Sequence, residues 1–473
     1  MISKPELVSA DILVVGGGPA GLMAAIRAAD LGVKDVVLAD KSNTLRSGNG
    51  GAGNDHFFSY IPECHGTDIK PVLYSLRHSL GSFDGRSSFE QTWLDRSFEM
   101  VKIWEGWGID MTYQGKCYDF ELVKKASLLG LRTTTVPEEF GGSDLDLKTI
   151  VLMWEELAWG DMGFAFSLYH TIFFGRGVAH MPEGLREEFL PKFLEDDTFL
   201  LAYSLSEPQG MTEVVLPYDG PDGGYKIFTE KQGDEYVLNG TKQYCSNAIN
   251  AKIIIINVRT KKNASIRESW SSFFMPADTP GLTIGKPHDH MGARLLPTSE
   301  LFLEDVRIPA RYLIGGEENL GFEQNLVHDP VVLLMKNTIV LGTLRALYEE
   351  SVSYAKERVV CGNPIITYPT IKVMLSDMRG KLEAARNMIW KCAWELDKDP
   401  LDTKHNNEMG YLVKAFMNEW TANFLRNADE IHGGMGTNRD MLVEKLIRDV
   451  FTLLHGLTNR SIAYLKSAPT LEP

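Results

Sequence analysis

Three glycines near the N-terminus, Gly16, Gly18 and Gly21, have the Gly-x-Gly-x-x-Gly spacing of a turn that binds a pyrophosphate. They follow the apolar segment DILVV and precede the Ala-rich segment PAGLMAAIRAADLG. In a strand–turn–helix the first glycine permits the tight turn, the second lets the backbone approach the phosphates, and the third allows close helix packing. The free N–H groups at the helix N-terminus favour an anion. Asp40 ends the next apolar segment and is placed to bind a ribose hydroxyl, so this region predicts nucleotide-binding geometry.

The elements that must position these glycines form a βαβ pattern, in which Gly32 closes the helix. After this unit the periodicity of the sequence changes from helical to strand-like, and then back to helical. The predicted pieces are helices at 68–84 and 87–107, a helical region to about 200, strands from 201 to 314 and long helices from 320 to 465. The order is therefore βαβ, α, β, α.

Composition and charge exclude several classes of partner. The chain has 473 residues, 44% hydrophobic and 23% charged, which is typical of globular proteins with more than one domain. A formal net charge of −15 argues against nucleic acid, and no apolar run reaches the length of a membrane span. The five cysteines form no Cys-x-x-Cys pair, so no metal site is predicted. Because no secretory signal pattern is present, we expect a cytoplasmic location.

Residues 8–118 resemble the N-terminus of the fumarate reductase/succinate dehydrogenase flavoprotein family, through VVGGGPAGLMAA, LADK and the loop RSGNGG at 46–51. Members often tether their flavin through a histidine just after the Arg-Ser, but Gly48 stands there, so covalent attachment is not expected. The resemblance ends near residue 118, before any counterpart of that family's substrate-capping domain. We therefore expect the segment to keep a fold element without being the redox centre.

From residue 119 onward the chain resembles the acyl-CoA dehydrogenase family. The match runs in register to about residue 450 and rests on six ordered motifs. They are TVPEEFGG at 135–142, LAYSLSEPQGMTE at 201–213, LNGTKQYCSN at 238–247, MGARLLPTSELFLEDVRIP at 291–309, ERVVCGNPI at 357–365 and EIHGGMGT at 430–437. The resemblance implies FAD as the cofactor and a CoA thioester as the substrate.

The resemblance also implies which residues hold the flavin ring. Such a ring needs donors to N5, N1 and O2, because those atoms take the hydride and the negative charge of the reduced form. Ser206 and Ser246 stand at positions whose hydroxyls and backbone N–H groups serve this purpose in the family. Tyr244 replaces a tryptophan against the ring, and Thr212 stands at the hydroxyl that usually contacts the CoA arm.

In the C-terminal region the resemblance implies contacts to the nucleotide end of FAD. Arg358 matches an arginine that reaches the pyrophosphate. Glu430, Gly433 and Gly434 match a Gly-Gly turn beside the adenine half. In relatives these groups come from a neighbouring subunit, so the resemblance implies a homotetramer or a homodimer.

The catalytic base of the family is missing from both of its usual positions. Removal of the α-proton of a thioester needs a carboxylate, while the β-hydride moves to the flavin. One position follows an Arg-Asp pair, but here Arg448-Asp449 is followed by VFTLLHGLTNRS. The other begins the long helix after GFE, where the register places Val332 and Leu333 in place of Glu and Arg.

Three alternatives follow from the missing glutamate. His455, offset by two residues from the glutamate position, could act as the catalytic base because imidazole titrates in the right range. His328 or Asp329 could reach in from the start of the long helix. Otherwise there is no enzymic base, and the protein performs a different reaction on a CoA thioester or none.

The predicted fold class is multidomain α+β: an acyl-CoA dehydrogenase fold preceded by a partial Rossmann-like βαβ segment. We expect four parts, which are the FAD-binding-like segment at 1–118, a truncated helical domain at 119–200, a middle β-barrel domain at 201–314 and a C-terminal helical bundle at 315–473.

The predicted function is FAD-dependent oxidation of an acyl-CoA to the 2-enoyl-CoA, or the reverse, with electrons exchanged with an electron-transfer flavoprotein. One alternative is a non-catalytic subunit that keeps the fold and binds a CoA thioester and FAD or serves assembly. A further alternative is fumarate-reductase-type activity from the N-terminal segment.

Overall fold

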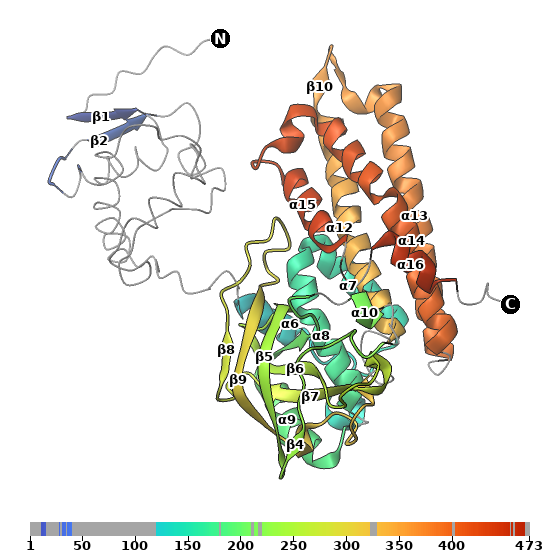
Figure 1. Cartoon of the computed structure of the whole chain (residues 1–473). Helices are drawn as coiled ribbons and strands as arrows, with labels where there is room; N and C mark the ends of the chain where they lie inside the picture. Colours follow the sequence, from blue (N-terminus) through green and yellow to red (C-terminus); the bar gives the residue numbers. More distant parts are fainter. Residues whose placement is uncertain are drawn as a thin grey trace. The chain divides into compact units, whose positions relative to one another are not determined.

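The computed structural model describes two units of the chain, Met1–Gln114 and Gly115–Pro473, each compact by itself. The described residues are 11–15, 28, 31–34, 36–39, 120–178, 181–209, 212–215, 220–321, 329–399, 403–454, 456 and 459–468 (Figure 1). Several predictions fall outside these residues, namely the helices at 68–84 and 87–107 and the residues Gly16, Gly18, Gly21, Asp40, His328 and His455.

The first unit contains a pair of parallel strands. β1 (Ile12–Val15) and β2 (Val36–Ala39) pair with Ile12 opposite Val36. Gly32 lies between them at φ 90°, in the left-handed region that suits glycine at the end of a helix. The two strands of the predicted βαβ unit and their parallel pairing are thus confirmed.

The second unit begins with four helices, α6 (Phe120–Leu128), α7 (Leu147–Gly160), α8 (Met162–Val178) and α9 (Glu183–Glu195). α7 begins where the Asp146 carboxylate accepts a hydrogen bond from Thr149 N–H at 2.8 Å. α8 is apolar around nearly its whole circumference because it packs against both the sheet and the long helix α12.

The sheet is built from seven strands, β3 (Leu200–Ser204), β4 (Lys231–Gln232), β5 (Glu235–Ser246), β6 (Ala251–Arg259), β7 (Trp270–Pro276), β8 (Leu282–Ile284) and β9 (Thr298–Pro309). Their order is β7-β6-β3-β5-β9-β8, with β4 beside β5. Every pairing is antiparallel except that of β3 with β6. The central strand β3 therefore ends between β5 and β6, next to α8.

The C-terminal helices form a bundle of α12 (Pro330–Glu357), α13 (Pro369–Lys398), α14 (Thr403–His432), α15 (Leu442–Leu454) and α16 (Arg460–Lys466). α12 is central and contacts α7, α8, α13, α14 and α15 (Figure 1). By length and composition alone α12 is apolar enough to cross a membrane, but 83% of its most apolar window is buried inside the protein. It is the core helix of the bundle.

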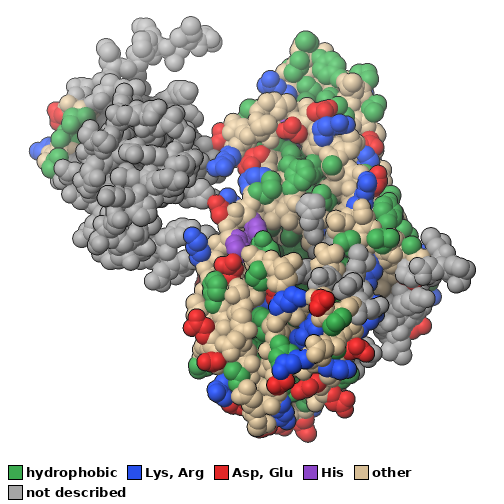
Figure 2. Space-filling model, viewed as in Figure 1, with side chains coloured by type: hydrophobic (Ala, Val, Ile, Leu, Met, Phe, Trp, Pro, Cys, Tyr) green, Lys and Arg blue, Asp and Glu red, His purple; other side chains and the backbone are tan. Residues whose placement is uncertain are grey.

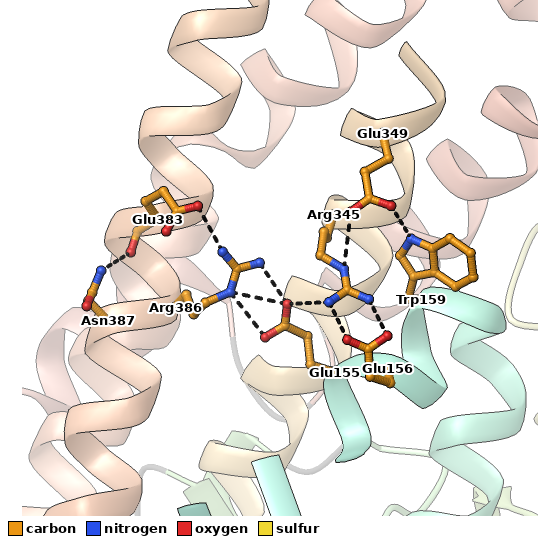
Figure 3. A network of polar contacts seen from close by, with 8 residues as sticks. All are labelled: Glu155, Glu156, Trp159, Arg345, Glu349, Glu383, Arg386 and Asn387. Atoms are coloured by element: carbon orange, nitrogen blue, oxygen red, sulfur yellow. Dashed lines mark hydrogen bonds and ion pairs between the residues drawn. The ribbon is translucent and has the colours of Figure 1, made fainter. Parts of the chain in front are cut away.

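A polar network ties α7 to α12 and α13. The buried Glu155 carboxylate of α7 lies 3.2 Å from Arg345 of α12 and 2.8 Å from Arg386 of α13 (Figure 3). Arg345 also makes two hydrogen bonds to Glu156, and Arg386 pairs with Glu383 at 3.0 Å. Each buried charge in this network has a partner, which is the condition for burying charges at low cost.

Candidate functional site

Ser206, Tyr244 and Ser246 lie together at one end of β3 and β5. Tyr203 of β3 stands opposite Ser246 of β5. The carbonyl oxygen of Ser206 accepts a hydrogen bond from Gln243 N–H at 2.9 Å. Both serines are partly buried, and within the described part of the chain neither hydroxyl has a partner. The structure therefore brings together three residues that the resemblance assigned to the flavin ring, and the two serines offer hydroxyls without partners.

Tyr244 is held in an unfavourable backbone conformation. Its φ is 56°, in the left-handed region that bulky residues avoid, and 55% of its surface is exposed. Its ring lies 5.3 Å from the ring of His288, which precedes β9. Strain of this kind persists where the surrounding structure imposes it, often at a binding site. Figure 2 shows histidine side chains exposed together on one face, where the helical bundle meets the sheet.

The residues assigned to the nucleotide end of FAD lie at one end of the helical bundle. The Tyr354 ring of α12 stacks on the His432 ring of α14 at 4.4 Å, and its hydroxyl donates to the His432 carbonyl at 3.3 Å. Arg358 follows one turn after Tyr354 and ends α12. Gly433 and Gly434 follow His432 directly, and no atom lies within 4 Å of a Cβ added at either. The backbone here is open to a ligand.

Glu430, in the last turn of α14, is exposed and lies 3.6 Å from Arg426. Thr212 begins the short helix α10 (Thr212–Val215) and is also exposed. Val214 and Val215 anchor α10 in a small apolar cluster with Leu205. Neither Glu430 nor Thr212 contacts the group formed by Ser206, Tyr244 and Ser246 through any hydrogen bond or ion pair of the described residues.

The two groups of predicted cofactor residues lie apart in a single chain. Arg358 precedes β10 (Val359–Val360), a short strand at the end of the bundle that is farthest from the sheet (Figure 1). Ser206, Tyr244 and Ser246 lie at the ends of β3 and β5, within the sheet domain.

The family's glutamate position on α12 holds no acid, as the register predicted, because Val332 and Leu333 are buried apolar side chains. Asp329 is the N-cap of α12, where its carboxylate accepts a hydrogen bond from Val331 N–H at 2.8 Å. It also lies 4.0 Å from Arg176. Burial raises the pKa of Asp329, and Arg176 opposes this shift. This carboxylate therefore has a structural task at the helix start.

Two lysines beside these positions, Lys336 half-buried and Lys414 buried, were not singled out from the sequence. Lys336 lies on α12, one turn after Val332, and Lys414 lies on α14. Burial, with a smaller contribution from Lys414, lowers the pKa of Lys336 to about 7. Burial lowers the pKa of Lys414 to about 8. The sequence does mark Lys336, because it is the only charged residue in the apolar run PVVLLMKNTIVLG.

Comparison with known protein families assigns most of the chain. Acyl-CoA dehydrogenase domains match in three consecutive parts: the N-terminal domain at residues 108–197, the middle domain at 202–306 and the C-terminal domain at 335–456. An FAD binding domain matches residues 11–143. A probable acyl-CoA dehydrogenase of Bacillus subtilis is 33% identical over 334 residues, which are 70% of this chain and 84% of that protein. The chain belongs to the acyl-CoA dehydrogenase family.

Further relatives agree with this assignment. The mitochondrial short-chain specific acyl-CoA dehydrogenase of Bos taurus is 30% identical over 330 residues, covering 69% of this chain and 76% of that protein. The structure of butyryl-CoA dehydrogenase from Megasphaera elsdenii superposes with a TM-score of 0.67 at 27% identity, covering 79% of this chain and 97% of that one. The predicted fold class, the fusion to an FAD-binding segment and the assignment to FAD-dependent acyl-CoA oxidoreductases are confirmed.

The described residues fit an FAD bound by the acyl-CoA dehydrogenase part. Ser206 and Ser246 present hydroxyls without partners in the described chain, beside the exposed aromatic face of Tyr244. At the end of the bundle, Arg358 is exposed beside a backbone turn that leaves open space. Hydroxyls and an aromatic face suit a flavin ring, whereas a guanidinium beside open backbone suits a pyrophosphate.

Proposed function

We propose that the protein oxidises an acyl-CoA to the 2-enoyl-CoA and passes the electrons to an electron-transfer flavoprotein. The observation that supports this most is the meeting of Ser206, Tyr244 and Ser246 at the end of β3 and β5, beside the helix α8 that packs on α12. FAD, when bound, supplies the hydride acceptor for the acyl chain.

The residues of the chain have distinct tasks in this proposal. The Ser206 and Ser246 hydroxyls orient the ring by hydrogen bonds. Tyr244 stacks on the ring, and the bound planar ligand then covers this exposed aromatic side chain. The buried apolar side chains of α8 and α12 keep water from the acyl chain. Thr212 is proposed to contact the CoA arm, because α10 leaves its hydroxyl side exposed.

We propose that FAD binds between two copies of the chain, as a homodimer or a homotetramer. Arg358, Gly433 and Gly434 of one copy would then hold the nucleotide end of an FAD whose ring lies against the sheet domain of another. Exposed apolar side chains on α13 support association, because Val373, Trp390 and Trp394 expose 69%, 43% and 45% of their surfaces.

Anaerobic titration of the purified FAD-loaded protein tests the proposal. Acyl-CoA thioesters of increasing chain length are added, and the visible absorbance of the flavin is followed. We expect at least one saturated thioester to bleach the flavin and to yield the 2-enoyl-CoA, identified by mass spectrometry. A flavin that no acyl-CoA reduces and no enoyl-CoA reoxidises would contradict it. Reduction of an added electron-transfer flavoprotein tests the electron acceptor separately.

A further inference from the structure

Lys336, half-buried on α12, and Lys414, buried on α14, lie in the region where these two helices cross closely. The crossing is fixed by Asn337, whose side-chain amide donates to the Gly410 carbonyl at 3.1 Å. A Cβ added at Gly410 would lie only 3.0 Å from the Cβ of Leu333, so the glycine permits the close approach. No carboxylate of the described residues raises the pKa of either lysine. One buried and one half-buried amine that share no counter-charge destabilise the fold, which indicates a task other than stability.

Both amines lie beside the places from which the family delivers its glutamate. Lys336 follows Val332 by one helical turn, so the two side chains share one face of α12. Lys414 Nζ donates to the carbonyl of Leu454, the last residue of α15, at 3.1 Å. His455, which follows Leu454 directly, stands two residues from the second family position.

A chain of contacts leads from Lys336 to the residues assigned to the flavin ring. Its Nζ lies 5.4 Å from the ring centre of Phe166 and 5.7 Å from that of Tyr169, both on α8. Between these two residues, the Ser167 carbonyl accepts a hydrogen bond from the side-chain amide of Asn247 at 2.9 Å. Asn247 follows Ser246 directly. The Lys336 amine therefore lies against α8, the helix that also holds Asn247 at the end of β5.

The other titratable groups around Lys336 do not neutralise it. On α8, burial and the charge of Lys336 lower the pKa of His170 to about 3, so this imidazole is neutral at physiological pH. Tyr169 keeps its proton because burial raises its pKa. Asp329 is held by Val331 N–H and by Arg176 at the start of α12. The remaining neighbour, Lys414 of α14, is a second cation, and it disfavours the charged form of Lys336.

We propose that the amine of Lys336 is the base that takes the α-proton of the bound thioester, in place of the glutamate that the chain lacks. This inference rests on the proposed function. In the step, the amine takes the proton from Cα and becomes an ammonium. A bound FAD would be the two-electron oxidant that accepts the hydride from Cβ. The electron pair left at Cα completes the Cα=Cβ double bond. Lys414 is a positioning residue, because its charge keeps the neighbouring amine neutral.

Deuterium exchange at Cα separates proton removal from oxidation. The probe is a 3-thiaacyl-CoA, whose α-proton is acidic and whose sulfur at position 3 has no hydride to give. The FAD-loaded protein is incubated with it in D2O, and incorporation is measured by mass spectrometry. The variants are Lys336→Met, Lys336→Arg, Lys414→Met and, as a matched control on an exposed lysine of α13, Lys372→Met. Binding of the probe is measured by calorimetry on the same samples.

We expect exchange in the wild type to rise with pH to a plateau above about pH 7, where the Lys336 amine is neutral. Lys336→Met lowers the exchange rate by about 100-fold or more, because a positioned base contributes at least that much. Lys336→Arg lowers it equally, since a guanidinium keeps its proton. Both keep the wild-type affinity for the probe within a few-fold. Lys414→Met moves the midpoint of the pH profile upward, and Lys372→Met changes nothing.

Exchange at the wild-type rate in Lys336→Met would overturn the inference while leaving the proposed function intact. A variant that exchanges normally but loses affinity for a thioester with a terminal carboxylate would also overturn it, and would assign Lys336 to carboxylate binding. A wild type that neither exchanges the probe nor is bleached by any acyl-CoA would instead contradict the proposed function. FAD content and melting temperature confirm folding, which is expected because methionine replaces the buried lysine stem with an apolar chain of similar length.

Discussion

Two regions of α12 hold half-buried positive charge in opposite ways. At Arg345 the charge is met by the carboxylates of Glu155 and Glu156, and Glu155 also binds Arg386 of α13 (Figure 3). At Lys336 the neighbours are aromatic rings and a second lysine. The first region is organised for stability, since every charge is paired. The second keeps a destabilising group, which we propose to be the base of the reaction, and this is the pattern expected where function outweighs stability.

The largest effect is expected from breaking the paired region. Glu155→Ala leaves Arg345 with Glu156 and Arg386 with Glu383, but removes the one carboxylate that joins α7 to both helices. We expect a loss of about 4 kcal/mol in the free energy of unfolding, because one partner of a buried ion pair is removed. Urea unfolding followed by circular dichroism measures it. A loss below about 1 kcal/mol would show that the network adds little stability.

Removal of the unpaired lysine is expected to raise the free energy of unfolding, whereas removal of Glu155 lowers it. Burial lowers the pKa of Lys336 to about 7 from an ordinary value of 10.5. Between these pH values the unfolded chain binds a proton that the folded chain lacks, so wild-type stability rises with pH, by at most about 1.4 kcal/mol per unit from this group. Lys336→Met is therefore more stable than the wild type at and below pH 7, and the difference shrinks toward pH 10.

Urea unfolding at several pH values checks this prediction, with Arg345→Met as the matched variant on the same helix. We expect Arg345→Met to be less stable than the wild type throughout, because it leaves Glu155 and Glu156 short of a partner. A stability difference between Lys336→Met and the wild type that does not change with pH would mean that Lys336 titrates as an ordinary lysine.

The smallest effect is expected at the exposed carboxylate of the network, Glu156, which contrasts with the buried Glu155. Glu156 is 67% exposed at its side chain, although it makes two short hydrogen bonds to Arg345. We expect Glu156→Gln to cost less than about 1 kcal/mol, since solvent screens such pairs. Unfolding in low and high salt measures it. A cost equal to that of Glu155→Ala would remove the distinction between the two carboxylates.

Much of the fold was predictable because the motifs occur in order and helical and strand periodicity differ strongly. The strands that carry LAYSL and LNGTKQYCS lie side by side as β3 and β5, and the apolar run from Pro330 forms the core helix α12. Ser206, Tyr244 and Ser246 were predictable as one group for the same reason, since strand pairing brings together segments that the motifs already mark.

The lysine pair was not predictable from motifs. Lys336 and Lys414 come together only through the crossing of α12 and α14, and a search for a carboxylate at fixed positions passes over an amine one turn away. The separation of Arg358 from Ser206 was not predictable either. The order of motifs along the chain does not say which end of a long helix lies far from the sheet. His455 and the glycine turn lie outside the described residues, so their assignments stay predictions.

The most direct test asks which part of the chain holds the flavin that reacts with a thioester. FAD content and anaerobic bleaching by acyl-CoA are measured on the full chain and on a chain that begins at Gly115, the start of the second compact unit. We expect the two proteins to contain the same amount of FAD per chain and to be bleached by the same thioester. Loss of FAD and of bleaching in the shortened protein, with its fold intact by circular dichroism, would contradict the account.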